Sequence, residues 1–86
     1  MNQISKREPV VFDIADVGKK GEFANCLAQA QYGDKIIYSR GLYAGGLHRD
    51  AAMNACEAGL VALVQKRIGK GRFNYIAQRT KKRIKK

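Results

Sequence analysis

Residues 59–78, GLVALVQKRIGKGRFNYIAQ, have the pattern of a β-hairpin. Both arms are rich in Val, Leu, Ile, Phe and Tyr, which suit a pleated, half-buried surface. Between them, Gly69-Lys70-Gly71 can adopt the positive φ angles that a tight reversal requires. A three-residue loop there predicts cross-strand pairs of Ile68 with Arg72, Val64 with Ile76 and Ala62 with Gln78 on one side of the ribbon, and of Arg67 with Phe73, Gln65 with Tyr75 and Leu63 with Ala77 on the other.

The positive charge of the chain is concentrated from the hairpin tip onward. The chain has 86 residues and a formal net charge of +10. Residues 1–64 contain seven basic and seven acidic residues, so their net charge is zero. Residues 65–86 contain ten basic residues and no acidic one. A segment with a single sign of charge predicts a surface that binds a polyanion, whereas a solvated surface normally mixes both signs.

These cations are candidate contacts to nucleic acid, because Lys and Arg bind phosphates and release condensed counterions. The alternative is a solvated surface with a solubilising tail. His48 and Arg49, at the predicted start of a helix, are secondary candidates for nucleic-acid contact. The primary candidates are Lys66, Arg67, Lys70, Arg72, Arg79, Lys81, Lys82, Arg83, Lys85 and Lys86.

The elements before the hairpin follow from spacing and glycine positions. Phe23, Leu27 and Ala30 fall on one face of a helix over residues 22–31. Residues 35–40 are rich in β-branched and aromatic side chains and predict a strand. A second helix over residues 47–58 has a narrow inner stripe of Ala52, Ala55 and Cys56. Residues 10–14 fit either a short strand or the approach to a helix.

This order of elements leaves two folds open within the α+β class. One is a winged-helix-like domain with a C-terminal β-hairpin wing and a basic tail. The other is a generic α+β domain in which residues 35–40 and the hairpin form a three-stranded sheet. In both, we divide the chain into a flexible N-terminal arm (1–9), a single domain (10–78) and a basic disordered tail (79–86).

The sequence offers little to an enzyme. His48 is the only histidine, and the glycine-rich residues 41–47 lack the pattern of a phosphate-binding loop. Cys26 and Cys56 are predicted to be reduced, buried thiols rather than metal ligands. We therefore expect no enzymatic activity, no cofactor and no metal. Phe73 and Tyr75 could stack on bases, but core packing is the preferred interpretation.

We expect an intracellular, cytoplasmic protein that is a monomer or a homodimer. The apolar runs are too short to span a bilayer, and residues 1–9 have no apolar signal-peptide core. The small size also argues against a large substrate-enclosing pocket.

The segments GDKIIYSRG (33–41), AGLVALVQKR (58–67) and FNYIA (73–77) resemble, in their order and spacing, small phage- and prophage-encoded accessory proteins. This resemblance implies a winged-helix-like fold and a phage or mobile-element origin, hence the cytoplasm of a bacterial host cell, and it brings no active site. Such proteins often inhibit host machinery by binding it.

Two functions are therefore predicted. The first is a non-catalytic nucleic-acid-binding protein that contacts phosphates through its hairpin wing and tail, with duplex DNA favoured and RNA also considered. The alternative is a phage-encoded, protein-binding inhibitor of a host defence or transcription complex, for example an anti-CRISPR or anti-restriction protein. Its basic surface would then occupy an acidic patch on a host protein complex.

Overall fold

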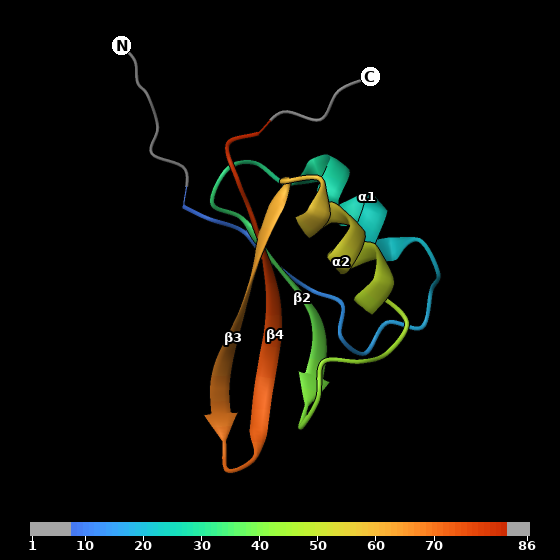
Figure 1. Ribbon diagram of the computed structural model, residues 1–86, viewed down its shortest axis with the longest axis vertical. Helices are drawn as coiled ribbons and strands as arrows, with labels where there is room; N and C mark the ends of the chain where they lie inside the picture. Colours follow the sequence, from blue (N-terminus) through green and yellow to red (C-terminus); the bar gives the residue numbers. More distant parts are fainter. Residues whose placement is uncertain (1–7, 83–86) are drawn as a thin grey trace.

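The computed structural model describes residues 8–82, in which strands and helices alternate before the chain ends in a hairpin (Figure 1). The predicted helices, the strand after Gly33 and the hairpin are all confirmed, and residues 10–14 contain a strand rather than a helix start. The elements are β1 (Val11–Asp13), α1 (Glu22–Gln29), β2 (Lys35–Gly41), α2 (Arg49–Glu57), β3 (Val61–Gly69) and β4 (Arg72–Arg79).

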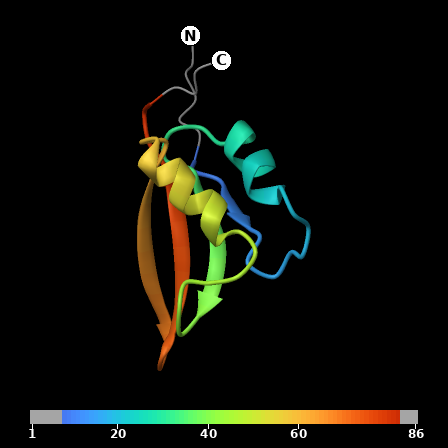
Figure 2. The same ribbon diagram turned by 45° about the vertical axis from the view of Figure 1, so that its right-hand side comes forward.

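All the strands belong to one mixed sheet with the order β1-β2-β4-β3. β1 pairs with β2 in parallel through the α1 crossover, and the other neighbours are antiparallel. Both helices lie against the same side of this sheet (Figures 1 and 2). The opposite side, which we call the open face, has no helix over it among residues 8–82.

The α+β class is confirmed. Of the alternatives, pairing of residues 35–41 with the hairpin is observed, with β1 as an additional strand. Hydrogen bonds from the residues on either side of β1 continue its attachment: Ile14 N donates to Ile37 O at 3.0 Å, and Val10 N donates to the buried Asp34 Oδ1 at 2.9 Å. Residues 8–82 contain two helices and a four-stranded mixed sheet, and the winged-helix-like arrangement stays a prediction.

The hairpin has the predicted register except next to the turn. Val64 opposes Ile76, Gln65 opposes Tyr75 and the other inner pairs match. The predicted pairing of Ile68 with Arg72 is wrong, because Gly69 pairs with Arg72. The chain reverses over Lys70-Gly71 with Gly71 at φ 66°. The resulting register shift lies between Arg67 and Gly69 and increases local twist.

The core lies between the sheet and the helices. Phe23 of α1 is 1% exposed, and its ring meets that of Tyr38 edge-on at 6.4 Å between centroids. Ala52 and Ala55 are buried on α2, as the small-residue stripe predicted, and such short side chains allow a helix to approach a sheet closely. The helix-covered face of the sheet therefore forms the hydrophobic core.

The boundary placed at residue 79 is wrong. β4 continues through Arg79, and Thr80 N donates to Leu60 O at 2.9 Å. Thr80 Oγ1 also donates to Gly59 O at 2.7 Å. Residues 79–82 therefore belong to the folded domain. Residues 1–7 of the predicted arm and 83–86 of the predicted tail lie outside the described residues.

Candidate nucleic-acid interface

The half of the hairpin nearest the turn projects beyond both helices (Figures 1 and 2). Every residue from Val64 to Ile68 is exposed, although side chains alternate between the two faces of a strand. Both faces of β3 are therefore open to solvent there. We call residues 64–74 the distal hairpin. The exposed cations of this segment are Lys66, Arg67, Lys70 and Arg72.

The four cations surround the hairpin instead of lining one side of it. Arg67 opposes Phe73 on the face that the helices cover nearer the base, and its Nε donates to Gly69 O at 3.3 Å. Lys66 opposes Asn74 on the open face, and Lys70 lies in the turn. A negatively charged ligand can therefore approach the tip from either face.

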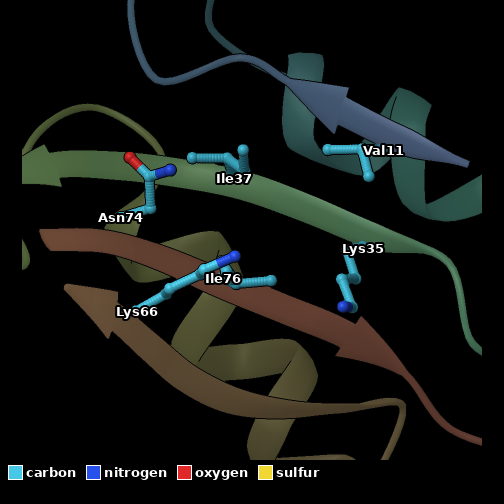
Figure 3. A pocket seen from close by; sticks show the side chains of 6 residues that line it. All are labelled: Val11, Lys35, Ile37, Lys66, Asn74 and Ile76. Carbon is cyan, nitrogen blue, oxygen red and sulfur yellow. The ribbon is translucent and has the colours of Figure 1, made fainter. Parts of the chain in front are cut away.

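The open face continues this basic surface toward the other end of the sheet. A hollow of about 190 Å³ is lined by apolar side chains with a lysine on either side of them (Figure 3). Lys66 of β3 supplies one of these lysines and Lys35 of β2 supplies the other. The residues that line the hollow are Val11, Lys35, Ile37, Lys66, Asn74 and Ile76.

Lys35 was missed in the sequence because it belongs to a region with zero net charge. The sheet brings it into line with the hairpin: Lys35 opposes Gln78 of β4, and Lys66 opposes Asn74. At ~3.3 Å per residue, these rows lie about 13 Å apart along β4, and Arg72 lies about 7 Å farther on. The three cations thus form a row that follows the long direction of the sheet.

Arg40, by contrast, is already neutralised. Its guanidinium donates to Asp13 Oδ2 at 2.6 Å and to Asp16 Oδ2 at 3.0 Å, while its Nε donates to Asn74 Oδ1 at 2.9 Å. The hydrogen bond to Asp13 is the main reason why the pKa of Arg40 lies above its ordinary value. Arg40 in turn balances the charge of Asp13 and Asp16, whose carboxylates would otherwise repel a phosphate at this edge.

His48 does not lie at the surface as predicted. Its side chain is 3% exposed, and Nε2 lies 2.8 Å from Val17 O. The ring connects the start of α2 to the loop before α1 and is too buried to reach a nucleic acid. Arg49 is exposed, but it lies on the helix side, 3.6 Å from Asp50 Oδ1.

Arg79 is another incorrect surface prediction. The residue is 8% exposed, and its Nη1 donates to Leu60 O at 3.1 Å and to Thr80 O at 2.9 Å. Its guanidinium holds the chain after α2 against the end of β4. Arg79 therefore has a structural role and leaves the set of candidate contacts.

Lys81 and Lys82 lie at the end of the sheet opposite the hairpin turn. Lys82 Nζ donates to Ala58 O at 2.6 Å, where a cation stabilises the carboxyl end of α2. Lys81 Nζ lies 5.4 Å from the centre of the Tyr32 ring. β4 from Arg72 to Arg79 spans about 23 Å, so the tip and these lysines form separate basic regions. Arg83, Lys85 and Lys86 lie outside the described residues.

Phe73 and Tyr75 pack in the interior, as preferred from the sequence. Tyr75 is 6% exposed and its hydroxyl donates to Leu42 O at 2.8 Å. Phe73 is half-buried against the core. Neither ring lies on the open face, so the sheet offers no aromatic surface there for base stacking.

The described residues contain no group of three or more His, Cys, Asp or Glu side chains that could hold a metal ion. Within the same residues, no helix has the length and apolar character needed to cross a bilayer. Cys26 and Cys56 are free thiols, and burial raises the pKa of Cys26.

No protein-family model, curated protein or solved structure gives a significant match to this chain. The candidate interface therefore rests on the positions of its own charged and apolar residues.

Proposed function

We propose that this chain is a non-catalytic nucleic-acid-binding protein of phage or mobile-element type that uses its hairpin as a wing. The observation that carries this proposal is the distal hairpin: it projects past the helices, is exposed on both faces and carries Lys66, Arg67, Lys70 and Arg72 without an acidic residue. The phage or mobile-element part of the proposal rests on the resemblance to phage accessory proteins.

Duplex DNA is the favoured ligand. A two-stranded ribbon fits the major groove, which is about 12 Å wide. Lys66, Arg67, Lys70 and Arg72 would bind phosphates on both sides of the ribbon, and Lys35 would extend the contact along the open face. Each phosphate neutralised on duplex DNA adds about 0.9 to the slope of log affinity against log salt. Binding should therefore weaken steeply as salt is raised.

The interface supports affinity more than sequence specificity. Arg67 and Arg72 could fork onto a guanine edge, but the other exposed cations are lysines that act as point charges. The outward face of α2 carries Asp50, Asn54 and Glu57, all exposed, and its carboxylates repel phosphate. We therefore expect α2 to face away from the bound duplex.

The test compares two double variants with the same loss of charge. Lys70→Ala/Arg72→Ala removes cations from the distal hairpin, whereas Lys19→Ala/Lys20→Ala removes exposed cations from the loop before α1. Fluorescence anisotropy with a labelled duplex should give at least a tenfold weaker Kd for the hairpin variant and less than a threefold change for the control. Equal losses would mean that net charge, rather than the hairpin, governs binding.

A pull-down from bacterial lysate, with and without nuclease, separates this proposal from the alternative of a protein-binding inhibitor. Apolar side chains between the lysines of the open face, such as Val64 at 44% exposure, are the feature that favours a protein partner. Recovery of nucleic acid that is lost on nuclease digestion supports the proposed function. A stoichiometric host protein that survives digestion would support the inhibitor instead.

A further inference from the structure

The loop between β2 and α2 exposes large apolar side chains. Leu42 is 59% exposed, Tyr43 is 78% exposed and Leu47 is 51% exposed. These three residues lie within six positions of the chain, so they form a local apolar group rather than scattered exposed residues. We call residues 42–47 the apolar loop.

The apolar loop lies beside the hairpin turn. Gly41, immediately before it, pairs with Phe73 of β4. The Tyr75 hydroxyl donates to Leu42 O at 2.8 Å. A Cβ atom added to Gly71 in the turn would lie 3.7 Å from Leu42 Cδ1. Leu42 therefore lies next to the hairpin tip, and Tyr43 follows it directly in the sequence.

The backbone of the loop is held although its side chains are exposed. Gly45 N donates to Ser39 Oγ at 3.1 Å, which ties the middle of the loop to β2. Gly41 at φ 130° and Gly46 at φ 89° reverse the chain at either side. The loop is thus held from fixed ends beside the hairpin turn, which contains Lys70.

This juxtaposition combines the two groups that single-stranded nucleic acids require. Cations bind the phosphates, and an exposed aromatic ring stacks on a base of any sequence. Within residues 8–82, Tyr32 and Tyr43 are the exposed aromatic residues. Tyr32 lies at the other end of the sheet, since the neighbouring Gly33 N donates to Arg79 O at 3.0 Å. Of these two residues, Tyr43 is therefore the one at the hairpin-turn end of the sheet.

Building on the proposed function, we infer that Tyr43 stacks on an unpaired base next to the phosphates bound by Lys70 and Arg72. The ligand class that fits is a duplex with a single-stranded overhang. The hairpin holds the duplex backbone, and the apolar loop receives the first unpaired base. Leu42 and Leu47 would cover the edge of that base and its sugar.

Affinity measurements on three labelled ligands test the inference: a blunt duplex, the same duplex with a four-nucleotide overhang, and the overhang strand by itself. Tyr43→Ala should weaken binding of the overhang duplex about tenfold, within the range for loss of one stacked base, and leave the blunt duplex unchanged. Tyr43→Phe should bind like the parent chain, because the ring is retained. Tyr32→Ala is the matched control and should have no effect.

The chain contains no tryptophan, so Tyr43→Trp supplies a single fluorescent reporter. Stacking should quench its emission with the overhang duplex and not with the blunt one. A blue shift on anionic phospholipid vesicles, without quenching by the overhang duplex, would assign the loop to a membrane surface and overturn the inference.

The two proposals fail in different ways. If Lys70→Ala/Arg72→Ala weakens binding to every ligand while all Tyr43 variants bind normally, stacking is wrong and the proposed function stands. If neither set of substitutions changes any Kd, both proposals are wrong. Loss of overhang preference in Tyr43→Ala, with the preference kept in Tyr43→Phe, is the result that supports the inference.

Discussion

The two halves of the hairpin belong to the same pair of strands, β3 and β4, but have opposite surroundings. Near its base, Val61 is 3% exposed, Tyr75 is 6% exposed and Ala77 is fully buried, because β2 and the helices pack around them. Toward the turn, Val64 and Ile68 are each 44% exposed and cations dominate. The comparison indicates that the base provides stability and the distal half is free to bind.

The exposed distal half also needs protection from unwanted pairing. β3 is an edge strand of the sheet, and an exposed edge can pair with another chain. Lys66 and Arg67 lie on this edge, where charged side chains oppose such pairing. The same residues can thus serve both solubility and ligand binding.

The largest expected effect is on the stability of the core that packs around the base of the hairpin. Phe23→Ala removes a ring that is 1% exposed and packs against Tyr38. Such a truncation costs about 3–5 kcal/mol of the free energy of unfolding, which is much of the ~5–15 kcal/mol typical of a small domain. Urea unfolding followed by circular dichroism measures it. Lys70→Ala, as the distal control, should change stability by less than about 0.5 kcal/mol. Similar losses at both positions would refute the division between a stabilising core and an exposed distal hairpin.

A smaller effect is expected from Lys35, which extends the basic row from the distal half toward the base. Lys35→Ala should weaken duplex binding severalfold and lower the salt slope by about 0.9, with little change in stability. Anisotropy titrations at four salt concentrations give both quantities. Lys82→Ala is a suitable control because Lys82 lies by the carboxyl end of α2. An unchanged slope for Lys35→Ala would confine the interface to the distal hairpin.

The smallest effect is a pH dependence of the free energy of unfolding, caused by Cys26 in the core. Burial is the main cause that raises the pKa of Cys26 above 9.0, and Glu22 adds to the shift. The folded state thus disfavours the thiolate, so stability is complete below pH 9.0 and decreases as pH rises from there through the folded pKa. Urea midpoints at pH 7.5 and 10 should differ less in Cys26→Ala than in the parent chain. An identical difference in both chains would exclude Cys26 as a contributor.

The hairpin could be predicted in detail because its signals are local. β-Branched and aromatic residues occur in both arms, and glycines mark the turn, so Val64 and Ile76 are correctly paired from sequence. The prediction failed at Ile68, where the turn shifts the register. Such a shift depends on the local backbone geometry of the turn, which the order of residue types does not predict.

The errors in the candidate site come from contacts between distant residues. His48 Nε2 contacts Val17 O and Arg79 donates to Leu60 O, and neither contact has a signature in the sequence near the buried residue. The same holds for the residues that were missed. Lys35 joins the basic row, and Tyr43 lies near the tip, because β2 pairs with β4. A charged or aromatic residue can be recognised in a sequence, but the face that it occupies depends on the sheet order.

The salt dependence of duplex binding tests the role of the distal hairpin most directly. The parent chain is compared with a variant in which Lys66, Arg67, Lys70 and Arg72 are all alanine. If each cation neutralises one phosphate, the slope of log affinity against log salt should fall by about 3.6, which is four times ~0.9, while the urea midpoint stays the same. An unchanged slope in a folded variant would contradict the proposal that the hairpin binds nucleic acid.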